Sequence, residues 1–172
     1  MSDSDSSAHT IRPMRTEDGA SVWRLIQRAG TLDLNSAYLY LLLGRFYGDT
    51  CLVATSGDDE HLAGFVTAFI PPGRDETVFL WQIGVDPDFQ GQGVAGRLLR
   101  ALLNLPACRR ARYLETTVTP SNDNSRGLFH AYARRANTEL SEHDFFPGEL
   151  FPEPEHEPEK LLRIGPIDKR PE

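Results

Sequence analysis

The turn at residues 90–95 is the part of this sequence whose residue types and spacing point most directly to chemistry. It reads Gln-Gly-Gln-Gly-Val-Ala and separates a strand-like run at residues 78–85 from an apolar run with helical spacing. The first N–H groups of a helix have no intrahelical acceptor, and the positive end of the helix dipole attracts phosphate oxygens. Gly91 and Gly93 have no Cβ, so a pyrophosphate can approach the backbone closely. The turn therefore predicts a pyrophosphate-containing cofactor.

Two common phosphate-binding motifs do not account for this turn. Gly91, Gly93 and Gly96 satisfy the spacing G-x-G-x-x-G. A dinucleotide-binding turn, however, is expected near the start of a parallel β-α-β fold, with an acidic ribose ligand after it. Here the turn begins at residue 90, after a predicted antiparallel meander. The pattern G-x-x-x-x-G-K-[ST], which cradles nucleotide phosphates, is absent from the sequence.

The hydrophobic pattern around the turn predicts an α/β fold with a mixed sheet. Alternating or continuous apolar runs predict strands at residues 10–14, 51–54, 62–70, 78–85, 113–119 and 160–164. Apolar residues three and four apart, with capping residues before them, predict helices at residues 17–29, 35–46, 94–105 and 122–136. A helical crossover makes the fourth and fifth strands parallel neighbours. The Pro- and Glu-rich stretch 151–159 is expected to be a loop.

The composition is typical of a soluble globular protein. The 172 residues are 40% hydrophobic and 25% charged, with a formal net charge of −7 at pH 7. A chain of this length can bury a core of its own, so we expect one domain. The net negative charge argues against a nucleic-acid partner, because such binding depends on clustered Lys and Arg. It is compatible with a cationic substrate.

Several features place the protein in the cytoplasm. Residues 1–9 are polar and acidic, unlike a signal peptide, and we expect a disordered tail there. No apolar run approaches the roughly 20 residues that span a membrane. Cys51 and Cys108 are the only cysteines, and we expect them to be reduced and buried. No cluster of His, Cys and Asp has metal-ligand spacing, so we expect no metal.

The cofactor turn resembles the acyl-CoA turn of the GNAT acetyltransferases. Its pattern is Gln-x-x-Gly-x-Ala, at Gln90, Gly93 and Ala95. The stretch Asn-x-x-Ser-x-x-Leu-Phe, which starts at Asn122, is similar to that family's Asn-x-x-small-x-x-Leu-Tyr helix start. The order of predicted elements also agrees over nearly the whole chain. The resemblance implies a GNAT acyltransferase fold at residues 10–167, a mixed central sheet with helices on both faces, and a short tail at residues 168–172.

The same resemblance implies acetyl-CoA as co-substrate and assigns residues to it. The backbone of Ile83, Gly84 and Val85 would pair with the pantetheine arm as an added strand, and the Val85 N–H would polarise the thioester carbonyl. The pyrophosphate would bind at the turn, formed by Gln90, Gly91, Gln92, Gly93, Val94 and Ala95. Asn122 and Ser125 would lie against the pantetheine.

Five further segments look like those of the diaminobutyrate acetyltransferases of the ectoine pathway. They lie at residues 32–38, 81–85, 113–122, 145–147 and 163–167. The implied reaction moves acetyl from acetyl-CoA to the 4-amino group of L-2,4-diaminobutyrate. The resemblance also implies a homodimer.

Such a substrate has two ammonium groups and one carboxylate, so its site needs acidic side chains. Glu115 shares one face of its strand with Thr117, and it serves either the site or a solvated edge. Asp33 precedes a helix and either binds substrate or caps that helix. Trp81 and Tyr38 belong either to the core or to the wall of the acceptor pocket. No arginine stands out as the partner of the substrate carboxylate.

The chemistry of the amine separates the roles of the two acids. With a reference pKa near 10.4, the amine loses its proton at pH 7 at a cost of about 4 to 5 kcal/mol, and a carboxylate that binds the ammonium raises that cost. We therefore expect Asp33 to anchor the α-ammonium group and Glu115 to accept the proton of the 4-amine. The family's general acid falls at Phe129, which has no proton to donate, so Tyr132 is a substitute candidate.

Alternatives stay open for one residue and for the function. His156, in the Pro- and Glu-rich stretch, would close over the acceptor as a similar His-Glu segment does in the family; otherwise it belongs to a solvated loop. The chain could also acetylate another small amine or a protein N-terminus. A third hypothesis is a regulator that binds acyl-CoA without catalysis.

Overall fold

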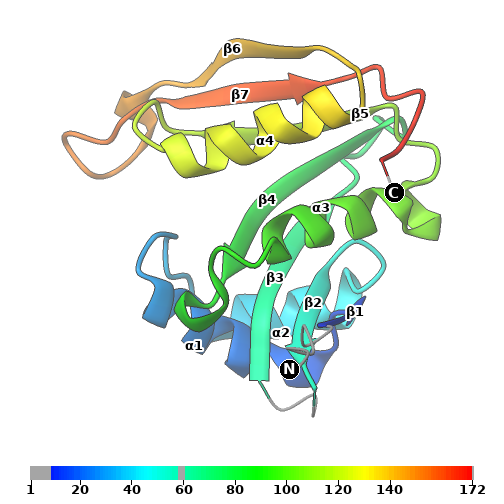
Figure 1. Ribbon diagram of the computed structural model, residues 1–172. Coiled ribbons are helices and arrows are strands. Elements are labelled where there is room, and N and C mark those ends of the chain that lie inside the picture. Colours follow the sequence, from blue (N-terminus) through cyan, green and yellow to red (C-terminus); the bar gives the residue numbers. More distant parts are fainter. Residues whose placement is uncertain (1–8, 58–60, 172) are drawn as a thin grey trace, which may run out of the picture. The chain divides into compact units, whose positions relative to one another are not determined.

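The structure, a computed structural model, describes residues 9–57 and 61–171. Strands and helices follow one another as β1 (Thr10–Pro13), α1 (Gly19–Ala29), α2 (Ala37–Phe46), β2 (Leu52–Ser56), β3 (His61–Phe69), β4 (Thr77–Val85), α3 (Val94–Asn104), β5 (Tyr113–Val118), α4 (Asp123–Arg135), β6 (Leu140–Phe146) and β7 (Glu159–Ile164) (Figure 1). The strand order of the mixed sheet is β1-β2-β3-β4-β5-β7-β6. These elements confirm the predicted fold class. The predicted tail at residues 1–9 lies, except for His9, outside the described residues.

The chain divides into two compact units. Unit 1 comprises Met1–Thr67 and Gln82–Leu102, and unit 2 comprises Ala68–Trp81 and Leu103–Glu172. Strands β3 and β4 contribute residues to both. The cofactor turn belongs to unit 1, whereas the strand that contains Glu115 belongs to unit 2. The expectation of a single domain stays a prediction.

In unit 1, helices cover both faces of the antiparallel strands. On one face, a Cβ added to Gly64 would lie 3.0 Å from Val94 of α3 and 2.9 Å from the carbonyl oxygen of Gly84, so only glycine allows this close approach. On the other face, Gly84 lies against Phe65 and Leu32, on the side of α1 and α2. The strands are correspondingly buried on both faces, as their continuous apolar runs predict.

Capping residues set the helix boundaries as predicted. Gly30 ends α1 in the left-handed conformation, with φ 64°. The Oγ of Ser36 accepts a hydrogen bond from the Tyr38 N–H at the start of α2, at 3.3 Å. The Oδ1 of Asn122 accepts one from the Ser125 N–H at the start of α4, at 3.1 Å.

In unit 2, β5 pairs in parallel with β4 and antiparallel with β7, which in turn pairs with β6. The β4–β5 register covers Thr77–Leu80 and Tyr113–Thr116, so the predicted parallel neighbours are confirmed. Helix α4 covers the face that includes Thr116 and Glu142, because Arg126 of α4 forms an ion pair with Glu142. The opposite face of this unit presents Phe79, Trp81, Tyr113, Glu115, Thr117, Leu161 and Arg163.

Strand β6 was not predicted. Its sequence, Leu-Ser-Glu-His-Asp-Phe-Phe, has no apolar alternation, and every residue after Leu140 is exposed. It lies at the edge of the sheet, where one neighbour, β7, is enough to hold it. Within the described residues, no helix has the length and apolar character needed to cross a bilayer.

Candidate active site

The predicted cofactor turn joins β4 to α3 in unit 1. Gly91 and Gly93 both have positive φ, 77° and 74°, which strains any residue with a Cβ. A Cβ at either position would meet no other heavy atom within 4 Å, so the requirement for glycine is conformational and the space beside the backbone is open. The first helical hydrogen bond runs from the Arg97 N–H to the Gly93 carbonyl, at 3.1 Å. The N–H groups of the first turn of α3 therefore begin directly after Gly93.

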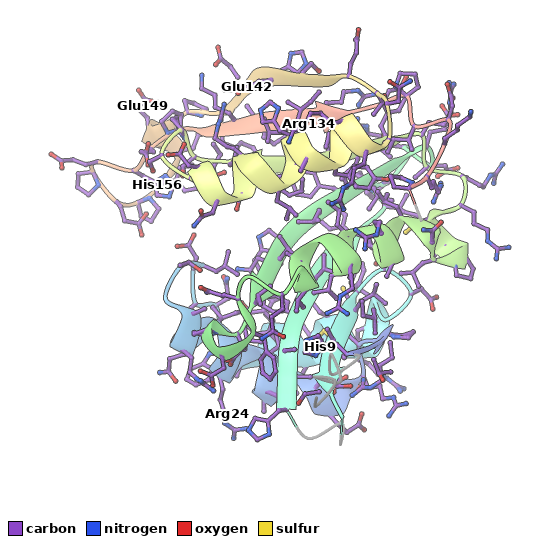
Figure 2. The ribbon with its side chains drawn as sticks, viewed as in Figure 1. His9, Arg24, Arg134, Glu142, Glu149 and His156 are labelled. Atoms are coloured by element: carbon purple, nitrogen blue, oxygen red, sulfur yellow. The ribbon has the colours of Figure 1, made fainter. Side chains whose placement is uncertain are left out.

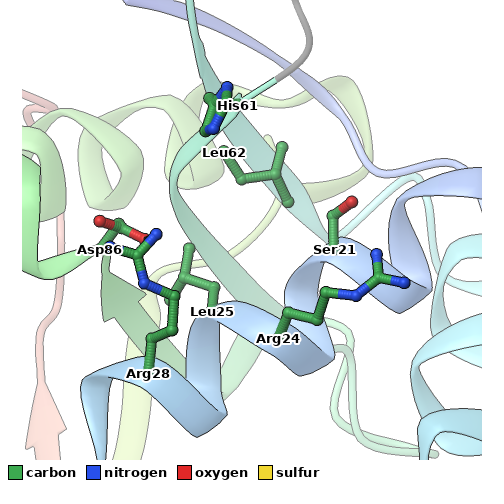
Figure 3. A pocket seen from close by; sticks show the side chains of 7 residues that line it. All are labelled: Ser21, Arg24, Leu25, Arg28, His61, Leu62 and Asp86. Carbon is green, nitrogen blue, oxygen red and sulfur yellow. The ribbon is translucent and has the colours of Figure 1, made fainter.

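An arginine of α1 is bonded to the segment that precedes this turn. Arg28 forms ion pairs with buried Asp86 at 3.2 Å and with exposed Asp88 at 3.0 Å, and the two carboxylates raise the pKa of its guanidinium. The Oδ1 of Asp86 also accepts a hydrogen bond from the Asp88 N–H, at 3.0 Å. Figure 3 shows Arg28 and Asp86 at one side of a pocket lined by Ser21, Arg24, Leu25, Arg28, His61, Leu62 and Asp86. The volume of this pocket is about 240 Å³. No local pattern predicts the pairing of Arg28, because its partners lie about 60 residues further along the chain.

The segment between α1 and α2 is held by buried polar groups of unit 1. The Tyr40 hydroxyl donates to Oε1 of Gln82 at 3.0 Å, and the Nε2 of Gln82 donates to the backbone carbonyl of Asp33 at 3.1 Å. The carboxylate of Asp33 is exposed and, among the described residues, has no hydrogen bond or ion pair. Ser36 caps α2, so the interpretation of Asp33 as the cap is wrong. Tyr38 is 66% exposed, so its interpretation as a core residue is also wrong.

Glu115 forms a buried ion-pair network in unit 2. Its side chain is only 3% exposed. The two terminal nitrogens of Arg74 donate to its two oxygens at 2.8 and 2.7 Å, and Arg163 donates to Oε1. Burial alone would raise the pKa of Glu115, but the hydrogen bonds and charges of Arg74 and Arg163 outweigh burial and hold that pKa below its usual value.

This network bears directly on the predicted roles of Glu115. The solvated-edge interpretation is wrong, because Glu115 is buried. A carboxylate with a lowered pKa whose oxygens already accept guanidinium hydrogen bonds is a poor proton acceptor. The geometry therefore disfavours the predicted role of general base. Glu115 and Thr117 share one face of β5, as predicted, and Glu115 pairs with Phe79 of β4. Trp81 follows Phe79 by two residues and so lies on the same face.

Helix α4 contains the residues expected near the acyl group. Phe129 and Tyr132 are both buried in unit 2. Burial is expected of a core residue and of a proton donor alike, so the role of Tyr132 as the acid stays a prediction. The amide of Asn122 caps the helix, and Ser125 is half-buried. Their contact with pantetheine stays a prediction.

His156 lies in the loop between β6 and β7 (Figure 2). Its ring stacks on Phe151, with centroids 3.8 Å apart, and its Nδ1 lies 2.6 Å from the carbonyl oxygen of Glu157. The ring is half-buried, so the loop holds it in one orientation instead of leaving it fully solvated. This order is compatible with the predicted role over the acceptor.

Comparison with known proteins identifies the family. The sequence profile of the acetyltransferase (GNAT) family matches residues 20–132. The chain is 49% identical over 153 residues to the L-2,4-diaminobutyric acid acetyltransferase of Marinococcus halophilus, covering 89% of this chain and 87% of that protein. It is 44% identical to the enzyme of the same name from Streptomyces anulatus, covering 92% and 90%.

The chain belongs to the diaminobutyrate acetyltransferases of the GNAT family. The structure of diaminobutyrate acetyltransferase EctA from Paenibacillus lautus, in complex with L-2,4-diaminobutyric acid and coenzyme A, matches with a TM-score of 0.89 and 40% identity. The match covers 95% of this chain and 98% of that one. Ard1 from Thermoplasma volcanium, at 20% identity and a TM-score of 0.73, shares the fold.

Membership of the GNAT family agrees with the prediction that the turn binds acyl-CoA. The roles of the individual site residues stay predictions. Unit 1 contains Asp33, Tyr38 and the cofactor turn. Unit 2 contains Trp81, Glu115 and the loop of His156. Within the described residues, no group of three His, Cys, Asp or Glu side chains is arranged to hold a metal ion.

Proposed function

We propose that this protein transfers the acetyl group of acetyl-CoA to the 4-amino group of L-2,4-diaminobutyrate, giving N4-acetyl-L-2,4-diaminobutyrate, as in ectoine biosynthesis. The observation that supports this most strongly is the 40% identity and TM-score of 0.89, over 95% of the chain, to an enzyme bound to that substrate and to coenzyme A. The reaction forms an N–C bond and breaks the C–S bond of the thioester. Two protons leave the ammonium nitrogen: the CoA thiolate takes up one, and the other is released to solvent.

Acetyl-CoA binds through the backbone in this proposal. The positive φ of Gly91 and Gly93 and the open space beside them suit a pyrophosphate at the N-terminus of α3. The pantetheine pairs with the backbone of Ile83, Gly84 and Val85, and the Val85 N–H polarises the thioester carbonyl. The β4–β5 register ends at Leu80, before these three residues. We place Asn122 and Ser125 beside the pantetheine.

The diamino acid binds through the side chains of predicted acceptor-site residues in this proposal. Asp33 anchors the α-ammonium group, since its carboxylate is exposed and has no partner among the described residues, while hydrogen bonds to the Asp33 carbonyl hold its backbone in place. Tyr38, Trp81 and Thr117 line the acceptor pocket, and His156 closes over it.

Proton transfer is the step for which the structure leaves the fewest candidates. Because Glu115 is a poor base, direct transfer of the amine proton to its carboxylate is unfavourable. In this proposal the proton passes first to a water molecule, and Glu115 accepts it only through that water. Tyr132 is the candidate acid for the thiolate. The reference pKa of a thiol, about 8.5, makes the thiolate a tolerable leaving group without a strong acid.

The remaining proposals rest on the family resemblance. We infer a homodimer in the cytoplasm, with no metal ion and no nucleic-acid or membrane partner. Size-exclusion chromatography with light scattering measures the oligomeric state directly.

The test of the function is thiol release from acetyl-CoA with a panel of diamino acids, polyamines and peptides. Selective turnover of 2,4-diaminobutyrate over ornithine supports the proposal. Equal rates across the panel leave only a general GNAT activity. Phe129, at the position of the family's usual acid, is the observation that favours a non-catalytic regulator. Binding of acetyl-CoA without thiol release with any amine would establish that alternative.

A further inference from the structure

The network of Arg74, Glu115 and Arg163 has a net positive charge. Two guanidinium groups face one carboxylate, so the formal charge of the cluster is +1. A cluster of this sign repels the ammonium groups of a diamine and attracts an anion. We propose that Arg74 and Arg163 bind the carboxylate of the diamino acid substrate. This inference rests on the proposed function and supplies the carboxylate partner that the sequence did not reveal.

The guanidinium groups retain donors that Glu115 does not use. Arginine has five N–H donors. Arg74 directs one terminal nitrogen to each oxygen of Glu115, and Arg163 directs one terminal nitrogen to Oε1. The side chains of Arg74 and Arg163 are 46% and 30% exposed, whereas Glu115 is 3% exposed. The acid is thus enclosed while the cationic groups remain accessible to a ligand.

Neighbouring groups fix both arginines before any ligand binds. The guanidinium of Arg163 stacks over the Tyr113 ring, 3.8 Å from its centroid. The backbone of Arg74 is held in a turn by hydrogen bonds with Pro71 and Thr77, and the two hydrogen bonds to Glu115 orient its guanidinium. Arginines held in this way lose little freedom when they bind a carboxylate, which they recognise through two parallel hydrogen bonds.

The position of the cluster on the sheet fits an acceptor subsite. Arg163 pairs with Glu115 across β5 and β7, and Phe79 of β4 pairs with Glu115 on the other side. Trp81 follows Phe79 by two residues, on the same face. This is the face of unit 2 opposite α4, and it presents the residues expected to contact the substrate.

The probe that separates this inference from the proposed function is 1,3-diaminopropane. It is 2,4-diaminobutyrate without the carboxylate, so the reacting amine and the carbon chain are retained. We expect wild-type protein to have a kcat/KM for 2,4-diaminobutyrate at least about 10-fold above that for 1,3-diaminopropane, as for a hydrogen-bonded charge. The substitutions Arg74→Gln and Arg163→Gln should each raise the KM for 2,4-diaminobutyrate about 10- to 100-fold. They should lower kcat/KM for 1,3-diaminopropane far less, because this amine has no carboxylate for the two arginines to bind.

The controls keep folding and function apart. Arg110→Gln removes an exposed arginine of unit 2 that has no partner among the described residues, and it should leave both substrates unaffected. If Arg163→Gln lowers the melting temperature, Arg163→Lys replaces it; lysine keeps the charge but loses the planar fork, and the same selective rise in KM is expected.

Three outcomes overturn the inference. The first is that the wild-type protein acetylates both compounds with equal kcat/KM. The second is that the Arg74 and Arg163 variants lower kcat/KM for both compounds by the same factor, or for neither. These two leave the proposed function intact. Wild-type protein that binds acetyl-CoA but acetylates neither compound overturns the proposed function, and the inference with it.

Discussion

Glu115 and Arg163 lie directly opposite each other on β5 and β7, and the guanidinium of Arg163 donates a hydrogen bond to Oε1 of Glu115. Arg74 occupies both oxygens of the same carboxylate from the turn before β4. This relationship changes the chemistry expected of Glu115. An acid that the strand pattern predicts as a proton acceptor is instead a buried anion that holds two cations.

The pH dependence of stability tests this ion-pair network. The pKa of Glu115 is lower in the folded state than its usual value of 4.5, so the carboxylate stabilises the fold above that pH. This stabilisation is lost as the pH falls through the folded-state pKa. We expect Glu115→Gln to lower the free energy of unfolding at pH 7 by about 1–3 kcal/mol.

Urea denaturation at pH 7 and at pH 3 to 4 measures this effect. The difference between wild type and Glu115→Gln should shrink at the lower pH, because the Glu115 carboxylate of the unfolded chain takes up a proton there before that of the folded protein does. A constant difference across the range would show that the charge of Glu115 contributes nothing. The same variant tests the predicted base: if its kcat falls far more than its affinity for acetyl-CoA, Glu115 does accept the proton.

Asp33→Asn should act on substrate binding alone. The carboxylate is exposed and unpaired among the described residues, so its loss leaves the melting temperature unchanged. The KM for 2,4-diaminobutyrate should rise about 10- to 100-fold, as for loss of a hydrogen bond between charged groups. Ser36→Ala is the matched control, because it removes the cap of α2 and costs about 1 kcal/mol of stability. An unchanged KM in Asp33→Asn removes Asp33 from the site.

Gly93→Ala should weaken acetyl-CoA binding. Alanine at φ 74° is strained by about 1–2 kcal/mol, so the turn shifts or the fold loses stability. The KM for acetyl-CoA should rise more than the KM for the amine. Gly127→Ala, in the interior of α4 with nothing within 4 Å of the added Cβ, should instead stabilise the protein by about 0.5–1 kcal/mol. If Gly93→Ala binds acetyl-CoA normally in calorimetry, the conformation of the turn is not required.

Arg28→Ala should loosen the segment that leads into the turn. Arg28 pairs with Asp86 and Asp88, but it is half-exposed, so the loss of stability should be small. The acetyl-CoA affinity should fall several-fold, and the effect should diminish at high salt, which screens these charges.

Arg24→Ala is the control for Arg28. Arg24 lies one helical turn earlier, in the same pocket, and it has no partner among the described residues. Equal effects of the two substitutions would point to the general positive charge of the pocket and not to the Arg28 ion pairs.

Arg170→Ala should destabilise the protein through its C-terminal segment. The Nη2 of Arg170 lies within hydrogen-bond distance of the carbonyls of Cys108, Arg109 and Ala111, at 2.9, 3.0 and 2.9 Å. Arg170 is thus anchored to the segment that contains Cys108. Loss of these bonds should cost about 1–2 kcal/mol, measured against Lys169→Ala.

A thiol-reactivity assay reports on the same contact. Burial raises the pKa of Cys108 to about 11, so wild-type protein should react slowly with a thiol reagent at pH 8. We expect Arg170→Ala to react faster because the thiol becomes exposed; loss of the Arg170 charge acts in the opposite direction, since that charge lowers the pKa of Cys108. Equal reaction rates in the two proteins would show that the contacts of Arg170 are not needed to keep Cys108 buried.

The sequence predicted the parts of the fold that local patterns encode. Ser36 and Asn122 cap the helices as expected, and the continuous apolar run of β3 is found in its burial on both faces. Strand β6 escaped prediction, because its polar residues are held by one neighbouring strand and not by burial. The partners of Glu115 lie 41 and 48 residues away in sequence. No local pattern predicts the pairing of Glu115 with Arg74 and Arg163. Strand position alone therefore predicts the role of proton acceptor for Glu115.

The most direct measurement of the proposed function is product analysis after incubation with acetyl-CoA and L-2,4-diaminobutyrate. Mass spectrometry and NMR should show N4-acetyl-L-2,4-diaminobutyrate formed in equal amount to the CoA thiol released, at a rate well above that with ornithine. A protein that binds acetyl-CoA but releases no thiol with 2,4-diaminobutyrate, or that acetylates another amine faster, would contradict the proposed function.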